Sequence, residues 1–108
     1  MPRYKLTLEY IGTNFSGWQK QKNSYSVQEA VERAAIKLLQ QKIDLVVAGR
    51  TDAGGHAEGQ VAHLDVDKIF CVRKMHLGIN FHLLNEKFGR EISVKKITKV
   101  NNNFSARF

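Results

Sequence analysis

The stretch Ser26-Val27-Gln28-Glu29-Ala30-Val31-Glu32-Arg33-Ala34-Ala35-Ile36-Lys37-Leu38-Leu39 carries the clearest structural signal in the chain. Its first four residues match a capping box, in which the serine accepts a hydrogen bond from one backbone N–H and the glutamate reaches back to another. Apolar residues then recur at helical spacing, while Glu32, Arg33 and Lys37 fall on the opposite, polar face. We therefore predict an amphipathic helix that starts at Ser26.

The segment before this helix has the two-residue period of a half-buried strand. Tyr4, Leu6, Leu8 and Tyr10 share one face, and the strand is expected to end near Gly12. Residues 12–25 have no clear period. A polar loop of this length is often functional.

The segments after the helix complete the pattern. We expect a short buried strand at Leu45–Ala48, a glycine-rich loop at 49–59, a strand at Gln60–Val66, a helix from Val72 to about Phe88 and a last strand at Glu91–Val100, whose alternation slips and indicates a bulge. The order βαββαβ predicts an α+β, ferredoxin-like fold: a four-stranded antiparallel sheet with two helices on one face. RNA-recognition domains use this layout, but their aromatic strand signature is not found here.

The composition is that of a globular domain and argues against a membrane-spanning or disulfide-bonded protein. The 108 residues, 43% hydrophobic and 25% charged, are typical of one globular domain, 1–108. No apolar run approaches the roughly 20 residues of a membrane helix. The single cysteine, Cys71, excludes an internal disulfide and a thiolate-rich metal site, and we expect it to be a small buried residue. These features predict a soluble, cytoplasmic protein that does not bind membranes.

The net charge of +7 is unevenly distributed. Residues 1–67 hold 8 basic and 8 acidic residues, whereas residues 68–108 hold 9 basic and 2 acidic residues. A local excess of this kind favours a polyanionic partner, with RNA or DNA ahead of a membrane. A solvated basic surface that only aids solubility is the alternative.

The loop 49–59 contains the highest concentration of side chains that could take part in catalysis. It contains Arg50, Asp52, His56 and Glu58 among four glycines. An arginine two residues from an aspartate keeps the carboxylate ionised, and such a carboxylate is a candidate nucleophile or general base. The alternative is a simple turn in which Asp52 bonds only to its own backbone. The four histidines have no metal-binding spacing, so no metal site is predicted.

Four motifs in this chain resemble the tRNA pseudouridine synthase A (TruA) family. The main one is Gly49-Arg50-Thr51-Asp52-Ala53-Gly54, followed by His56-Ala57 and Gly59-Gln60-Val61-Ala62-His63. The others are residues 10–19, which end in Gly-Trp-Gln, the helix start at 26–30, and Phe104-Ser105-Ala106-Arg107-Phe108. They occur in the family's order and extend over essentially the whole chain.

The resemblance implies a tRNA pseudouridine synthase that isomerises uridine in the anticodon stem-loop without a cofactor or metal. Asp52 matches the family's nucleophile, which attacks a flipped uridine at the base or at ribose C1′. Arg50 matches the arginine that holds this aspartate and assists base flipping. The resemblance further implies substrate contacts by a second set of residues: Thr51, Gly54, His56, Gln60 and Arg107.

The resemblance also has limits. Gly55 replaces a usual valine, Ser105 replaces a usual histidine, and residues 85–90 replace a short proline-containing turn. The family continues into a second half with an active-site tyrosine, so we expect this chain to be the N-terminal half, with the C-terminal half absent, and its activity alone to be weak. The family is dimeric, which implies a homodimer. A non-catalytic RNA-binding module and a small interaction domain without an RNA role are the alternatives.

Overall fold

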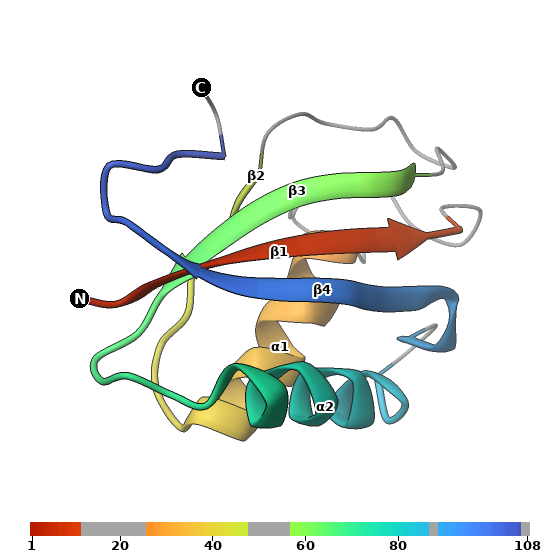
Figure 1. Ribbon diagram of the computed structural model, residues 1–108. Helices are drawn as coiled ribbons and strands as arrows, with labels where there is room; N and C mark the ends of the chain where they lie inside the picture. The colour runs from red at the N-terminus through yellow and green to blue at the C-terminus, as the bar shows by residue number, and fades with distance from the viewer. Residues whose placement is uncertain (12–25, 48–56, 87–88, 107–108) are drawn as a thin grey trace.

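A computed structural model describes residues 1–11, 26–47, 57–86 and 89–106, and the statements below concern these residues. The elements, in chain order, are β1 (Arg3–Tyr10), α1 (Val27–Leu39), β2 (Val46–Val47), β3 (Ala57–Asp65), α2 (Val72–Leu83), the 3₁₀ turn η1 (Gly89–Glu91) and β4 (Ile92–Val100). The strands form one sheet in the order β2-β3-β1-β4, and every pairing is antiparallel. Both helices lie against one face (Figure 1), which confirms the predicted ferredoxin-like fold.

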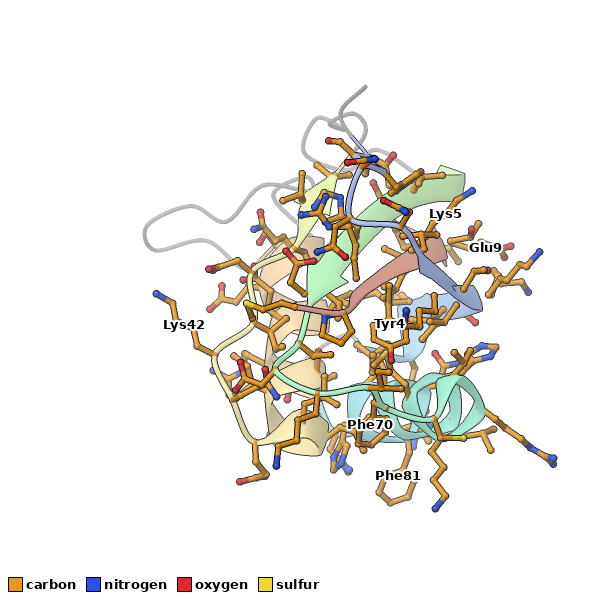
Figure 2. All side chains as sticks on the ribbon, turned by 60° about the vertical axis from the view of Figure 1, so that its left-hand side comes forward. Tyr4, Lys5, Glu9, Lys42, Phe70 and Phe81 are labelled. Carbon is orange, nitrogen blue, oxygen red and sulfur yellow. The ribbon has the colours of Figure 1, made fainter. Side chains whose placement is uncertain are left out.

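The core lies between the sheet and the helices. Tyr4, Leu6, Leu8 and Tyr10 of the central strand β1 are at most 2% exposed, as their alternation predicts. In Figure 2, Tyr4 extends to the helix side of the sheet toward Phe70, while Lys5 and Glu9 extend to the other side. The Tyr4 hydroxyl accepts a hydrogen bond from the Phe70 N–H (2.8 Å) and donates one to the Phe70 carbonyl (2.9 Å). This pair joins β1 to the segment that leads into α2.

Helix α1 begins as predicted but buries one more polar residue than its pattern indicates. The Ser26 Oγ accepts a hydrogen bond from the Glu29 N–H at 3.1 Å. Glu32, predicted on the polar face, is only 3% exposed. Its Oε2 accepts hydrogen bonds from the Leu45 N–H and the Gln28 side chain, both at 2.9 Å. The chain returning from α1 brings a backbone N–H to this carboxylate, and this tertiary contact explains the error.

Helix α2 ends at Leu83, so the predicted end near Phe88 is wrong. The N–H groups of Asn85 and Glu86 bond to the carbonyls of His82 and Leu83, three residues back, and these tight turns end the helix. Cys71 is exposed at the N-cap of α2, so its predicted burial is wrong too. The reason is that the helix directs its apolar stripe, Met75, Ile79 and Leu83, to the core and leaves its first residues outside.

The strands differ from the predictions mainly at their ends. The described part of β2 is two residues long, with Leu45 buried just before it, and β3 starts at Ala57 rather than Gln60. The bulge expected in the last strand is confirmed. Thr7 lies opposite Lys96 and Leu8 opposite Val94, so Lys95 is the extra residue. The bulge returns Val94 to the core face, where it is 1% exposed.

An ion-paired carboxylate connects the two helices. The Glu86 side chain is 3% exposed and lies 2.8 Å from the Arg33 Nε and 2.7 Å from the Lys37 Nζ, both on α1. Burial alone raises the pKa of Glu86, but the hydrogen bonds from Lys37 and Arg33 outweigh it and leave the pKa below its ordinary value. The turn after α2 is thereby attached to α1.

We predict that Glu86→Gln lowers the free energy of unfolding by about 1–2 kcal/mol, because two charge-assisted hydrogen bonds are lost while Arg33 and Lys37 remain partly hydrated. A lowered folded-state pKa contributes stability above the unfolded pKa, near 4.5, that is lost as the pH falls through the folded value. Urea unfolding at neutral pH and at about pH 3 measures both effects. The difference between Glu86→Gln and the unaltered chain should shrink at low pH. Glu9→Gln, an exposed carboxylate, is the matched control and should change little.

Candidate functional site

Most of the residues predicted for the site lie outside the described part of the chain. These are Arg50, Thr51, Asp52, Gly54, His56 and Arg107. Gln60 is described: it lies on β3 opposite Leu8, on the helix-facing side of the sheet, and is half-buried. The roles of all seven residues stay predictions. The structure describes the strands that flank the two loops predicted to be functional, residues 12–25 and 49–59.

One end of the sheet brings the attachment points of both loops together. Tyr10, near the start of the 12–25 segment, is paired with Ala57, the first residue after the 48–56 segment. On the other side of β1, the Ile11 N–H donates to the Glu91 carbonyl of η1 at 3.0 Å. The end of β1, the start of β3 and the start of β4 are therefore adjacent. The motif at residues 49–54 ends three residues before Ala57, so the chain enters the described sheet at this end.

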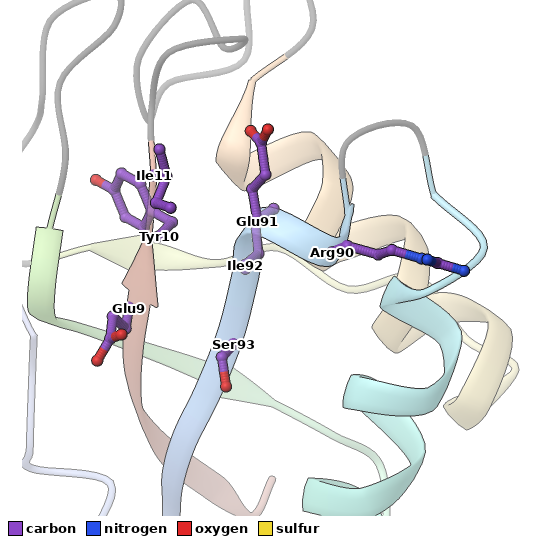
Figure 3. Close-up of a pocket in the computed structure, with 7 residues that line it drawn as sticks. All are labelled: Glu9, Tyr10, Ile11, Arg90, Glu91, Ile92 and Ser93. Carbon is purple, nitrogen blue, oxygen red and sulfur yellow. The ribbon is translucent and has the colours of Figure 1, made fainter.

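A pocket lies at the same end of the sheet, between the end of β1 and the start of β4 (Figure 3). It combines two carboxylates, a guanidinium, a hydroxyl and three larger apolar or aromatic side chains. Its lining residues are Glu9, Tyr10, Ile11, Arg90, Glu91, Ile92 and Ser93. Sequence reasoning did not single out this pocket, because its residues come from segments about 80 positions apart that only the β1–β4 register brings together.

The face of the sheet opposite the helices carries polar and basic side chains at its centre. Lys5 and Thr7 of β1 lie beside Thr98 and Lys96 of β4 in the register. The described basic residues of the stretch 68–108 do not all lie on one face of the domain. Arg73 and Lys74 belong to α2 on the helix side, whereas Lys96 is on the open face with Lys5. The fold divides the basic residues of this stretch because α2 and β4 lie in different layers.

The C-terminal segment Asn101–Ala106, which we call the strap, crosses part of the open face (Figure 1). Arg3 holds it in place. The Arg3 guanidinium forms a two-point ion pair with Asp65, at 2.8 and 3.1 Å, and also donates to the carbonyls of Asn102 (3.2 Å) and Phe104. The hydrogen bond from Arg3 lowers the pKa of Asp65, so this pair remains charged in mild acid.

The strap has further contacts with β1 and β3. The Lys5 Nζ lies 5.6 Å from the centre of the Phe104 ring, and the His63 ring meets Phe104 edge-on at 6.2 Å. The buried N–H of Ala106 donates to the His63 Nδ1 at 3.1 Å. Sequence reasoning missed Arg3, His63 and Asp65 as strap anchors. Their period-two positions place them on the open face, but nothing local shows that the C-terminal residues return to them.

Comparison with known proteins agrees with the sequence motifs. The chain is 45% identical over 108 residues, its whole length, to tRNA pseudouridine synthase A of Bartonella quintana (strain Toulouse). It is 44% identical to the protein of the same name in Bartonella henselae and 45% identical to that in Brucella ovis, again over 108 residues. No family model matches the chain.

This chain is a homologue of tRNA pseudouridine synthase A. The match covers 100% of this chain but 42–43% of each of these relatives, so the chain spans less than half of their length and corresponds to their N-terminal half. The resemblance expected from the Gly-Arg-Thr-Asp-Ala-Gly motif is therefore confirmed.

The described residues contain no candidate membrane-spanning helix and no candidate metal-binding cluster. Among the described residues, no helix is long and apolar enough to cross a membrane. Within the same part of the chain, no group of three or more His, Cys, Asp or Glu side chains is arranged to hold a metal ion.

Proposed function

We propose that residues 1–108 are the nucleophile-bearing domain of a tRNA pseudouridine synthase, an isomerase that converts uridine to pseudouridine in the anticodon stem-loop of tRNA. The observation that carries this proposal is the 45% identity over the whole chain to curated relatives named tRNA pseudouridine synthase A. The intact motif at residues 49–54 supports it. The domain would work in the cytoplasm, together with the half that the relatives have in addition.

The proposed reaction needs only Asp52 and Arg50 of the chain beside the uridine itself. Asp52 attacks a uridine that has been flipped out of the stack, either at the base or at ribose C1′. The N-glycosidic bond breaks, the uracil turns, and a new C–C bond joins ribose C1′ to uracil C5. The bond between Asp52 and the substrate then breaks, C5 loses its proton and N1 gains one, so the product is an isomer of the substrate. Arg50 keeps the carboxylate ionised and helps to hold the base out of the helix. Thr51, Gly54, His56, Gln60 and Arg107 contact the substrate in this proposal.

The framework described above supports this assignment on physical grounds. A nucleophile must be held within about an ångström of its target, and misplacement by that distance can cost on the order of a hundredfold in rate. The motif ends three residues before Ala57, which is paired with β1, so the chain enters the described sheet close to it.

Asp52→Asn should reduce isomerisation of tRNA transcripts by roughly a thousandfold or more, since the amide is not a nucleophile. It should change the free energy of unfolding by no more than about 0.5 kcal/mol, as expected for a loop residue outside the core. The assay needs the 108-residue chain with the remaining half supplied, because the isolated chain is expected to be weakly active. Asp67→Asn, an exposed position after β3, is the matched control and should keep full activity. Undiminished turnover in Asp52→Asn would refute the assigned role.

We propose that tRNA lies against the open face of the sheet, where Lys5 and Lys96 are diagonal neighbours. Each phosphate contact releases counterions and steepens the dependence of affinity on salt.

Lys96→Ala should weaken tRNA binding and reduce the slope of log affinity against log salt by about 1, because one phosphate contact is lost. Filter binding at several salt concentrations measures this slope. Lys74→Ala removes the same charge from the helix side of the domain and should leave the slope unchanged. Equal effects of the two substitutions on the slope would contradict tRNA binding at the open face, because the loss of charge would then act equally on both sides of the domain.

We also propose that the protein assembles as a homodimer. Helix α2 and its C-cap residue support this with three exposed apolar side chains on the outer surface, Leu77, Phe81 and Leu84, at 62%, 63% and 55% exposure. Their spacing of four and three residues places them in one stripe, opposite the buried stripe. Exposed apolar patches on a soluble domain commonly mark a protein interface.

Phe81→Ser should therefore shift the chain toward the monomer in sedimentation velocity, with roughly a tenfold weaker self-association constant, because a large apolar side chain leaves the stripe. Ile69→Ser changes another exposed apolar residue, 74% exposed, that lies before α2, and serves as the control. A monomer at all concentrations in the unaltered chain would contradict the proposed dimer.

A further inference from the structure

The strap is held by two kinds of contact that respond differently to protons. Arg3 keeps its charge at any pH a folded protein meets, and its bonds to the Asn102 and Phe104 carbonyls need no particular protonation state of the strap. Its partner Asp65 has a lowered pKa and also stays charged in mild acid. The first half of the strap is therefore attached by contacts that persist below neutral pH.

The second half of the strap depends on a titratable acceptor. The Ala106 N–H donates to the His63 Nδ1 at 3.1 Å, and both residues are buried, at 7% and 4% exposure. A backbone N–H can bond to Nδ1 only when that nitrogen carries no proton. Protonation of the imidazole turns Nδ1 into a donor that faces another donor, so the bond is replaced by a repulsive contact.

Charged groups of both signs are among the described residues near His63. Asp65 lies on the same strand and interacts electrostatically with the ring. Met1, Lys42 and Asp44 line one pocket with it, and Lys5 lies opposite it on β1. The described strap contributes no titratable side chain, since residues 101–106 read Asn-Asn-Asn-Phe-Ser-Ala.

We propose that His63 is a positioning residue that acts as a pH-sensitive latch: its neutral imidazole fixes the end of the strap against β3, and its protonation releases that end while Arg3 still holds the beginning. The latch can be tested without the proposed reaction, because it involves only contacts within the domain.

Amide hydrogen exchange of the 108-residue chain, followed by NMR from about pH 8 to pH 5 and expressed as protection factors, tests the latch. The Ala106 amide should lose at least about tenfold in protection as the pH falls, the equivalent of one hydrogen bond. The Phe104 amide, which bonds to the Asn101 carbonyl at 2.9 Å, is the internal reference and should keep its protection.

Two substitutions sharpen the test. His63→Leu should give a weakly protected Ala106 amide at every pH, because it removes the acceptor. His82→Leu is the matched control at a half-buried histidine on α2, and it should reproduce the pH profile of the unaltered chain. If His63→Leu does not fold, the pH series on the unaltered chain still decides the question. A pH-independent Ala106 protection factor, or the same pH profile in a folded His63→Leu, would overturn the proposal.

Discussion

Burial of one face of β1 is the constraint on which the rest of the structure depends. Four side chains at alternating positions, Tyr4, Leu6, Leu8 and Tyr10, fill the space between the sheet and the helices. A shift of register by one residue would turn this whole set to the opposite face, so the pairing of β1 with β3 and β4 is strongly specified. Because β1 lies between β3 and β4 in the described sheet, the positions of β3 and β4 follow from it.

The same register has two consequences for function at different ends of the sheet. At one end it aligns Tyr10 with Ala57 and Ile11 with Glu91, which brings the attachment points of the motif-bearing segments beside the pocket of Figure 3. Toward the other end it places Arg3 opposite Asp65 and Lys5 opposite His63, which creates the anchors for the strap. A single strand therefore helps to position both the candidate site and the strap.

The polar groups of the interior are satisfied by residues that lie far apart in sequence. Glu32 accepts the Leu45 N–H, Glu86 is bonded to Arg33 and Lys37, and Asn80 on α2 exchanges two hydrogen bonds with the Val94 backbone on β4, at 2.9 and 3.0 Å. The bonds at Val94 cover part of the outer edge of β4, which would otherwise present unpaired backbone groups. Leaving a buried polar group unbonded costs about 1–3 kcal/mol, so these contacts help to define the packing of α1 and α2.

The amino-acid sequence by itself determined the order of the elements and the family. Period-two alternation in β1 and the capping box at Ser26 are local signals, and neighbouring residues are sufficient to read them. The motif Gly49–Gly54 is also local, and it pointed to the family that the comparisons with curated relatives then confirmed. The roles of Asp52 and Arg50 rest on this resemblance.

Only the tertiary structure decided where α2 ends, why Glu32 is buried and Cys71 exposed, and how the basic residues of 68–108 are divided between two layers. It alone showed that Arg3 and His63 hold a strap about 100 and 43 positions away in the chain. These features depend on contacts between segments that are distant in sequence. No local pattern encodes such contacts, because their free energy exists only after the sheet has formed and brought both partners to one face.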